Sequence, residues 1–284
     1  MQLNFSQFFA IIPLMTKKVI AIDLDGTLLR RDHTISENSV KTIQQVIAKG
    51  HTVVIATGRP YRMAKAYYKQ LGLTSPMINF NGAMLHIPEK AWAGEHAITI
   101  DRSYLLELLQ ETHRFELDFV ASEYRDHFLV TLDQRDKIDP KLFGLNELSD
   151  DLLLNPNQLL ADPLALLVQT RHEDKYQLAK EIKAYFRHEI EVDSWGGPLN
   201  LLEFSPKGIN KAYALERLLT SLGRSREDLI AFGDEQNDTE MLAFANVGYA
   251  MKNANPMLLE YADQQISYTC DEDGVAQQLR ELFL

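Results

Sequence analysis

Two aspartates separated by a single residue follow the first apolar run of the sequence. Asp23 and Asp25 belong to the segment Asp23-Leu24-Asp25-Gly26-Thr27, which begins where the run Val19-Ile20-Ala21-Ile22 ends. A second acidic segment, Gly233-Asp234-Glu235-Gln236-Asn237-Asp238, follows another apolar run late in the chain. Both segments therefore carry carboxylates to points where buried strands are predicted to end.

The carboxylates of these two segments predict a cation site with phosphate chemistry. Crowded carboxylates repel one another unless a cation or a proton lies between them. Oxygen ligands without a nearby histidine or cysteine favour a hard cation, and Mg²⁺ is the natural choice. Mg²⁺ in turn favours phosphate chemistry, and a carboxylate can attack phosphorus once a metal offsets its charge.

Two further polar clusters supply donors for a phosphate group. Thr57-Gly58-Arg59 follows the second apolar run, and Lys207 and Lys211 stand at the opening of a later helix. A threonine hydroxyl and a lysine ammonium both suit phosphate oxygens. Of the two lysines we favour Lys211, because it falls in the first turn of the helix, whereas Lys207 follows Pro206 in a predicted turn.

Each of these residues taken alone also has an ordinary structural explanation. An aspartate at a strand end often caps a helix or closes a turn, and Thr57 could cap the helix that Pro60 opens. Lysines are usually solvated. Four fixed residues in the pattern Asp-x-Asp-Gly-Thr, however, arise by chance in about one protein of this length in several hundred, at ~5% usage per residue. The clusters together therefore favour chemistry over capping.

The order of the predicted elements indicates what positions these clusters. Apolar β-prone runs alternate with amphipathic helices and short loops, which is typical of a right-handed parallel sheet. Ligands of such sheets bind at the carboxyl ends of the strands, where all four clusters are expected. The predicted strands are 19–22, 52–56, 77–80, 228–232 and 247–251, and the predicted helices are 36–50, 60–71, 209–222 and 256–262.

The pattern changes in the middle of the chain, where the order strand, helix, strand, strand occurs twice. This order indicates an α+β insert with a mainly antiparallel sheet. We therefore predict an α/β fold with a doubly wound, Rossmann-like core of residues 15–84 and 203–284 and an inserted cap domain of residues 85–202. Tyr124, Arg125 and Trp195 lie near predicted ends of cap strands, where surface or core roles are the simpler interpretation. The predicted cap strands are 97–100, 118–122, 127–132, 164–170, 189–195 and 199–204, and the predicted cap helices are 104–113 and 173–186.

Composition narrows the partners and the location. The chain has 284 residues and a formal net charge of −11, which argues against a nucleic-acid or membrane-surface partner but is compatible with a small anionic substrate. The single cysteine, Cys270, makes no internal disulfide and fits the reducing cytoplasm. Residues 1–14 are apolar but have no basic start and no cleavage site, so we predict an N-terminal extension and not a signal peptide.

The motifs together resemble those of the haloacid dehalogenase-like phosphatases. The Asp-x-Asp-Gly-Thr segment and its spacing to Gly-Asp-x-x-Asn-Asp carry the match. The chain order is similar to the Cof-type branch, whose large α/β cap is inserted after the third core strand. The resemblance extends from about residue 15 to the end of the chain, and it is strong in the core and weak in the cap. Further matching segments are Ala56-Thr57-Gly58-Arg59, Phe80-Asn81-Gly82-Ala83 and Pro206-Lys207-Gly208-Ile209-Asn210-Lys211.

The resemblance implies a role for each matching residue. Asp23 would be the nucleophile, Asp25 the general acid and base, and Lys211 would neutralise the nucleophile and the transferring group. The branch usually has glycine where this chain has Ala212, a departure that removes no reactive group. The resemblance assigns the phosphate and substrate contacts to Thr57, Gly58, Arg59, Asn81, Gly82 and Asn237. It assigns the Mg²⁺ ligands to Asp23, Asp25 through its backbone carbonyl, Asp234 and Asp238.

The motifs and the resemblance therefore predict a magnesium-dependent phosphatase of small phosphorylated metabolites that acts through a phospho-aspartate. Sugar phosphates are the first candidates, followed by nucleotide and cofactor phosphates. Two alternatives stay open. A sugar phosphomutase, or a phosphatase dedicated to one disaccharide phosphate, would carry the same motifs. A non-catalytic phosphometabolite-binding protein is disfavoured, because binding alone does not need a general acid such as Asp25. No oligomeric state is predicted.

Overall fold

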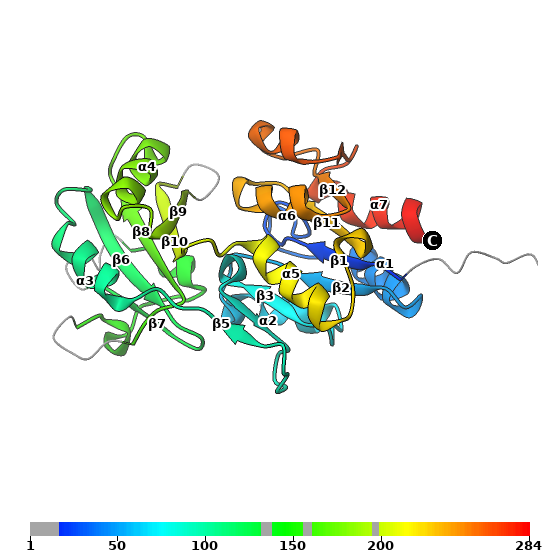
Figure 1. The fold of residues 1–284 in the computed structure, drawn as a ribbon, viewed down its shortest axis with the longest axis horizontal. Helices are drawn as coiled ribbons and strands as arrows, with labels where there is room; N and C mark the ends of the chain where they lie inside the picture. The colour runs from blue at the N-terminus through cyan, green and yellow to red at the C-terminus, as the bar shows by residue number, and fades with distance from the viewer. Residues whose placement is uncertain (1–16, 132–137, 156–160, 195–198) are drawn as a thin grey trace, which may run out of the picture.

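The chain folds into two lobes (Figure 1). One lobe, which we call the core lobe, contains both ends of the described chain, and the other, the cap lobe, contains most of its middle. The predicted extension of residues 1–14 and the side chain of Trp195 lie outside the described residues. The computed structural model describes residues 17–131, 138–155, 161–194 and 199–284.

A five-stranded sheet with parallel strand pairs forms the centre of the core lobe. Its middle strand β1 (Val19–Ile22) pairs with β11 (Leu229–Gly233) on one side and with β2 (Thr52–Ile55) on the other. Beyond β11 the sheet continues with β12 (Val247–Ala250) and β13 (Gln264–Gln265). Because the strands are parallel, the polar segments that follow β1, β2 and β11 leave the sheet at the same edge.

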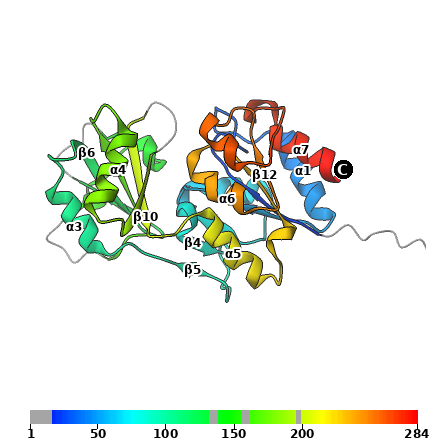
Figure 2. The ribbon, with the colours of Figure 1, turned by 45° about the horizontal axis from the view of Figure 1, so that its top comes forward.

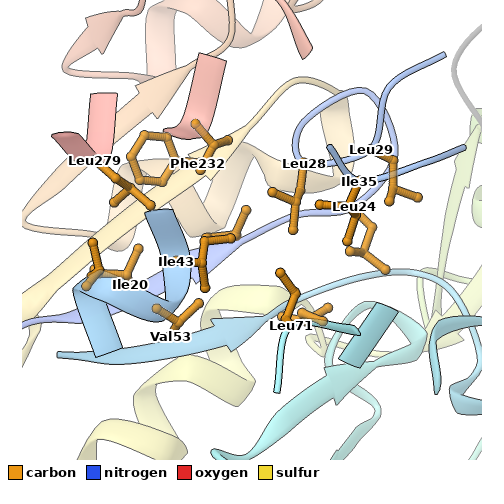
Figure 3. Close-up of a cluster of buried hydrophobic side chains, with 14 of the residues drawn as sticks. Ile20, Leu24, Leu28, Leu29, Ile35, Ile43, Val53, Leu71, Phe232 and Leu279 are labelled. Carbon is orange, nitrogen blue, oxygen red and sulfur yellow. The ribbon is translucent and has the colours of Figure 1, made fainter. Parts of the chain in front are cut away.

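Helices cover both faces of this sheet, so β1 is buried on its two sides. Ile20 (Figure 3) packs toward one face together with Ile22, and Val19 and Ala21 pack toward the other. Burying such an aliphatic side chain contributes ~1.5–3 kcal/mol. The first face is covered by α1 (Glu37–Ala48), α2 (Tyr61–Gln70) and α7 (Gly274–Phe283), and the second by α5 (Lys211–Ser221) and α6 (Thr239–Phe244). Figure 2 shows α1 and α7 side by side.

Side-chain caps decide where two of these helices begin. The Ser36 hydroxyl accepts a hydrogen bond from the N–H of Ser39 at the start of α1. The side chain of Asn210 accepts a hydrogen bond from the N–H of Tyr213 at the start of α5. These bonds satisfy N–H groups that a helix leaves unpaired in its first turn. Asn210 therefore fixes Lys211 as the first residue of α5.

The third predicted core strand lies mainly in a different sheet, which corrects the expectation for residues 77–80. β3 (Met77–Asn79) pairs antiparallel with β4 (Met84–His86), and β4 pairs with β5 (His96–Ala97). One parallel bridge, between Ala56 and Ile78, connects β3 to the end of β2. The chain reverses after β3 because Phe80, Asn81 and Gly82 adopt positive φ angles of 52°, 49° and 106°.

The cap lobe is built on an antiparallel five-stranded sheet. Its helices α3 (Arg102–Gln110) and α4 (Lys175–Tyr185) pack on one face against apolar side chains that include Leu166, Val168 and Phe204. The opposite face carries Leu167 and is partly covered by apolar residues between 138 and 153. In spatial order the strands are β7 (Phe128–Val130), β6 (Leu117–Glu123), β8 (Ala165–Thr170), β10 (Leu201–Pro206) and β9 (Ile190–Ser194).

The predicted fold class is confirmed: a parallel sheet with helices on both faces carries an inserted α+β lobe. β10 continues to Pro206 within the cap sheet and so crosses residue 203, where the sequence analysis placed the start of the second core segment. Among the residues that the structure describes, no helix has both the length and the apolar character that crossing a bilayer requires.

Candidate active site

A fully buried lysine joins two carboxylates at the carboxyl edge of the core sheet. Lys211 is 0% exposed, and its Nζ donates hydrogen bonds to Asp23 Oδ1 and Asp238 Oδ1, both at 2.7 Å. Burial by itself would lower the pKa of Lys211, but the two carboxylates raise it above its ordinary value. The ammonium therefore stays charged, and a buried charge is stable only with such partners.

Asp234 adds a third carboxylate to this centre. Oxygens of Asp23, Asp234 and Asp238 all lie within 4.8 Å of one another. Burial, together with the neighbouring carboxylates, raises the pKa of Asp23 to about 7 even though Lys211 opposes the shift. The same causes raise the pKa of Asp234 to about 9. Three carboxylates face one ammonium, so a cation or protons must offset the remaining negative charge.

Short loops hold these carboxylates in place. Asp234 Oδ1 accepts a hydrogen bond from Thr27 Oγ1 at 2.9 Å. Asp238 Oδ2 accepts from the backbone N–H groups of Asp234 at 2.9 Å and Glu235 at 3.3 Å. Gly26 has a φ of +75°, and a Cβ at this position would lie 2.1 Å from Asp234 Oδ2. Glycine at position 26 therefore lets the loop after β1 approach the loop after β11.

The carboxylate of Asp25 lies outside the three-carboxylate cluster and pairs with Arg59. The guanidinium donates from Nε to Oδ2 at 2.6 Å and from Nη2 to Oδ1 at 2.5 Å. The side chain of Asp25 is 46% exposed, whereas that of Arg59 is 18% exposed. A two-pronged guanidinium–carboxylate pair fixes both position and orientation. Arg59 thus holds an accessible carboxylate beside the buried centre.

The loop after β2 gathers the predicted phosphate-binding side chains. The Thr57 hydroxyl accepts a hydrogen bond from the N–H of Arg59 at 3.1 Å, and its own hydrogen can be donated to a ligand. A Cβ on Gly58 would lie 3.1 Å from Asn81 Oδ1, so the Asn81 side chain lies against this loop. Asn237 Nδ2 donates to the same Asn81 oxygen at 3.0 Å, which connects this group to the loop after β11.

Gly82 acts in a different way from the other predicted binding residues. A Cβ at this position would lie 2.1 Å from the carbonyl oxygen of Asn210, which caps α5. Its φ of +106° is a conformation that other residues rarely adopt. Gly82 therefore allows the turn that carries Asn81 to touch the start of the helix that carries Lys211.

A cavity of about 750 Å³ opens beside these groups and is lined by both lobes. Its size suits a small metabolite. The sequence analysis identified the core side of this cavity and left the cap side unassigned. The core lining includes Asp23, Asp25, Thr57, Gly58, Arg59, Asn81, Asp234 and Asn237, and the cap lining includes Glu123, Asp139, Lys141, Leu167, Asp193 and Glu203.

One face of the cap sheet supplies part of this cap lining. Glu203 on β10 stands directly opposite Leu167 on β8 and Asp193 on β9. Glu203 Oε2 lies 3.3 Å from the position that a Cβ on Gly58 would take, so it reaches the loop after β2. Two carboxylates directly opposite each other destabilise an antiparallel strand pair. The Asp193–Glu203 pair is therefore not explained by the stability of the sheet.

A half-buried ion pair joins the lobes beside the cavity. Arg62 on α2 donates from both terminal nitrogens to the two carboxylate oxygens of Glu123 on β6, at 2.7 and 2.8 Å. The same guanidinium lies 4.8 Å from the centre of the Phe128 ring. The sequence analysis missed this pair, because no local pattern connects residues 61 positions apart.

The sequence analysis also missed Glu203, although a local signal was present. Both neighbours of Glu203 on β10 are buried and apolar. Successive side chains of a strand face opposite sides of the sheet, so this pattern could have predicted that Glu203 faces away from its two neighbours.

Three of the side chains considered in the sequence analysis lie away from the centre. Lys207 pairs with Glu189 at 3.0 Å, and both side chains are more than half exposed. Tyr124 is buried and stacks on His127. Arg125 pairs with Glu95. Structural contacts account for all three, and the structure brings Lys211 to the carboxylates as the sequence analysis favoured.

The three-carboxylate cluster is a candidate metal site. Its donors are oxygen atoms of Asp23, Asp234 and Asp238, and neither histidine nor cysteine belongs to the cluster found among the described residues. One ammonium offsets only part of their charge. Hard cations such as Mg²⁺ prefer oxygen ligands, so the residues present fit this ion.

A doubly wound core, an inserted lobe, and carboxylates and a lysine at the strand ends define an α/β enzyme with its site between two lobes. Residues 20–279 match the family described as haloacid dehalogenase-like hydrolase. The chain therefore belongs to the haloacid dehalogenase-like hydrolase family. The resemblance drawn from the motifs is confirmed, and so is the expectation that the chain is a phosphatase of this family.

Relatives and a solved structure agree with this assignment. A 5-amino-6-(5-phospho-D-ribitylamino)uracil phosphatase of Bacillus subtilis is 36% identical over 265 residues, which cover 93% of this chain and 97% of the relative. An HMP-PP phosphatase of Yersinia enterocolitica is 30% identical and covers 93% and 94%. A haloacid dehalogenase-like hydrolase from Bacteroides thetaiotaomicron has a TM-score of 0.77 at 25% identity, and the match covers 94% of this chain and 100% of that one.

Proposed function

We propose that the protein is a magnesium-dependent phosphatase that hydrolyses phosphate monoesters of small metabolites through a phospho-aspartate on Asp23. The observation that carries the proposal is the buried ammonium of Lys211, 2.7 Å from both Asp23 and Asp238. An ammonium at this position offsets the charge of the nucleophile and of the arriving phosphoryl group, most strongly as the two merge in the transition state. The phosphatase names of the relatives support the reaction class.

Two aspartates carry the chemistry in this proposal. A carboxylate oxygen of Asp23 attacks phosphorus, so that a bond from Asp23 to phosphorus forms while the bond to the leaving oxygen breaks. Asp25, the general acid, gives a proton to that leaving oxygen. In the second step a water attacks phosphorus and gives a proton to Asp25. Inorganic phosphate leaves, and the Asp23 carboxylate is restored.

The phosphoryl group is held by donors around the nucleophile. We assign contacts with its oxygens to the Lys211 ammonium, the Thr57 hydroxyl and the side-chain amide of Asn237. Asn81 orients that amide through the hydrogen bond of 3.0 Å. Gly58 adds a position without a side chain, which allows the substrate to approach the backbone. Arg59 serves this site through Asp25.

We assign the Mg²⁺ ligands to Asp23, Asp234, Asp238 and the backbone carbonyl of Asp25. The all-oxygen donor set and its excess negative charge support this assignment. When bound, the ion offsets charge between the nucleophile and the phosphoryl group. The protein residues contribute the geometry: Thr27 fixes Asp234, and the backbone N–H groups after β11 fix Asp238.

The inserted lobe, residues 85–202 in the sequence analysis, acts as a lid in this proposal. The Arg62–Glu123 pair holds the two lobes together at the edge of the cavity. Closure of a lid excludes bulk water while the phosphoryl group is attached to the enzyme. The cap face over the cavity then contacts the leaving group and selects among substrates.

We assign recognition of the leaving group to Glu203, Asp193 and Leu167. Carboxylates accept hydrogen bonds from hydroxyl groups and repel a second anionic group. This chemistry favours phosphates of uncharged, hydroxyl-rich molecules, such as sugars and sugar alcohols, over bisphosphates. The B. subtilis relative at 36% identity is named for a substrate with a phosphorylated ribitylamino chain. That compound is therefore the first to test.

Release of inorganic phosphate tests the reaction class. The wild-type protein with Mg²⁺ should release phosphate from members of a panel of sugar, sugar-alcohol, nucleotide and cofactor phosphates. Asp23→Asn should reduce kcat at least about 10³-fold, because the amide is not a nucleophile for phosphorus. Asp32→Asn, on an exposed loop, is the matched control. A near-normal kcat for Asp23→Asn would exclude the mechanism, and isomerised substrate without phosphate release would identify a mutase.

Ranking the same panel by kcat/KM tests the substrate class. Fructose 6-phosphate and fructose 1,6-bisphosphate form a matched pair that differs by one phosphate. The monophosphate should have a kcat/KM about tenfold higher or more, which corresponds to ~1.4 kcal/mol of discrimination. Glu203→Gln should narrow that difference. Equal rates with both sugars would contradict the assignment of the cap carboxylates, without affecting the proposed chemistry.

A further inference from the structure

Two buried polar residues that belong to no motif connect β4 to the loop after β2. Asn79 on β3 is 0% exposed, and His86 on β4 is 2% exposed. Asn79 Nδ2 donates a hydrogen bond to the carbonyl oxygen of Arg59 at 2.8 Å, and Asn79 Oδ1 lies 2.9 Å from His86 Nε2. The Tyr61 ring on α2 packs nearly perpendicular to the His86 ring, with 5.1 Å between the ring centres.

Hydrogen-bonding capacity fixes the direction of both bonds. A backbone carbonyl can only accept, so the Asn79 group that faces Arg59 is the NH₂ group, and the group that faces His86 is the oxygen. His86 must therefore donate from Nε2. Burial lowers the pKa of His86 to about 4, so its neutral form with the hydrogen on Nε2 is present at neutral pH. The imidazole thus holds the Asn79 amide in one orientation.

The hydrogen bond to the Arg59 carbonyl fixes the backbone of the loop after β2 at this residue. Arg59 is followed by Pro60, which has no N–H and makes no side-chain cap for α2. The side chain of Arg59 makes both hydrogen bonds that hold Asp25. Whatever fixes the Arg59 backbone therefore also fixes the base of the side chain that orients Asp25.

The packing around β3 does not require a polar pair. The neighbouring residues Met77, Ile78 and Phe80 are buried and apolar. Replacing both members of a buried hydrogen-bonded pair by apolar groups of similar shape is often nearly neutral for stability. An amide and an imidazole between apolar neighbours therefore indicate a role other than folding.

We propose that Asn79 is a positioning residue for the phosphatase reaction. Held by His86, it fixes the Arg59 carbonyl and so maintains the guanidinium that orients Asp25 toward the leaving oxygen. This inference rests on the proposed function, in which Asp25 gives a proton to that oxygen.

The dependence of the rate on the leaving group tests the inference. The p-nitrophenolate group leaves without a proton, whereas an alkoxide needs one, so only alkyl phosphates depend strongly on the general acid. Asn79→Leu should reduce kcat about tenfold or more with the best alkyl phosphate of the panel, and less than about threefold with p-nitrophenyl phosphate. A residue that only stabilises the fold would reduce both rates by the same factor. Equal losses, or no loss with either substrate, would overturn the inference.

Two controls accompany this experiment. Thr42→Val removes a buried hydroxyl on α1 that donates to the Asn38 carbonyl at 2.8 Å, and it should leave the ratio of the two rates unchanged. Combining Asn79→Leu with Arg59→Ala should add no further loss beyond Arg59→Ala alone, because the two residues act through one path. Additive losses would contradict the inference.

A second pair of variants keeps the inference testable if Asn79→Leu does not fold. His86→Gln retains an N–H donor for Asn79 Oδ1, whereas His86→Leu has none. His86→Leu should show the leaving-group-dependent loss, and His86→Gln should recover most of the alkyl phosphate rate. Equal rates for these two variants would contradict the inference. Wild-type protein that releases no phosphate would overturn the proposed function, whereas an active wild type with equal losses on both substrates overturns this inference alone.

Discussion

Lys211→Met tests the electrostatic centre of the site directly. The substitution keeps the length of the side chain and removes its charge. In the wild-type protein the ammonium is fully buried and donates to Asp23 and Asp238 at 2.7 Å. In the variant both carboxylates remain in the same buried position without a cation between them.

The magnitude follows from the charges that stay behind. At an effective dielectric constant of about 20, two unit charges about 4 Å apart attract by ~4 kcal/mol, and Lys211 makes two such contacts. Methionine also removes the cost of burying the ammonium, so the net effect is smaller than their sum. Removing one partner of a buried ion pair costs about 3–5 kcal/mol. We expect Lys211→Met to lose that much unfolding free energy at pH 8 in the absence of added metal.

The pH dependence of this loss has a definite sign. Without the ammonium, the folded-state pKa of Asp23 rises further above its unfolded value, because Lys211 is the group that lowers it. A carboxyl group with a raised folded-state pKa binds protons more strongly in the folded protein, so the loss should shrink as the pH falls toward 5. A loss that grows on acidification would contradict the assignment.

Urea denaturation in EDTA, followed by circular dichroism, measures the difference. Lys207→Met is the matched control, because Lys207 pairs with Glu189 on the surface and such pairs contribute about 0–1 kcal/mol. The phosphatase assay should show a loss of kcat of about 10²–10³-fold for Lys211→Met, typical of a preorganised electrostatic group, and little for Lys207→Met. The reasoning is refuted if Lys211→Met is as stable as the wild type at pH 8, or if Lys207→Met is the inactive variant.

Three further predictions follow from other parts of the site. Exhaustive EDTA treatment should abolish phosphate release, Mg²⁺ should restore it and Ca²⁺ should inhibit it by imposing looser coordination; full activity after EDTA would contradict the metal assignment. Gly26→Ala should lower kcat/KM about 10²-fold by displacing Asp234. Gly223→Ala is the control, because its φ of +63° imposes similar backbone strain but no atom lies within 4 Å of the added Cβ; equal losses of kcat/KM in the two variants would contradict this reasoning. Because the folded-state pKa of His86 is about 4, below its unfolded value of about 6.5, acidification from pH 7 to pH 5 should cost the wild type about 2 kcal/mol more than His86→Leu; parallel pH–stability curves from urea denaturation would contradict it.

The core of the site could be predicted because its signals are local. The segments after β1, β2 and β11 each combine a buried apolar run with polar residues at the strand end. Parallel strands bring such ends to one edge whatever the intervening sequence, so residues as distant as Asp23 and Asp238 could be expected to meet. The position of Lys211 also followed from a local pattern, because it falls in the first turn of the helix predicted over 209–222, and α5 does begin at Lys211.

The cap side of the site and the hydrogen bonds from His86 through Asn79 to Arg59 could not be predicted from the sequence. Both depend on strand register and on the direction of individual side chains. Glu203 faces the cavity because it pairs with Asp193 and Leu167, and no short pattern fixes which strand pairs with which. β3 was expected in the parallel sheet because its apolar character suits either sheet. The turn at Asn81 that sends the chain back into β4 needs positive φ angles in Phe80 and Asn81, and a bulky residue such as Phe80 rarely adopts one.

The place of β1 in the middle of its sheet also determines the order in which the protein can fold during synthesis. β1 can pair with β2 as soon as both have left the ribosome, but its other neighbour begins at Leu229. At about 5–20 residues per second, translation from Ile55 to Leu229 takes on the order of 10–30 s. Throughout that interval β1 has one unpaired edge, and α5 does not yet cover the sheet face that it covers in the finished protein. The strands of the cap sheet all lie between Leu117 and Pro206, so the cap lobe can complete its own sheet in the same interval. The cap sheet can therefore form before the core sheet is complete, and until then the unpaired edge of the core exposes the nascent chain to aggregation.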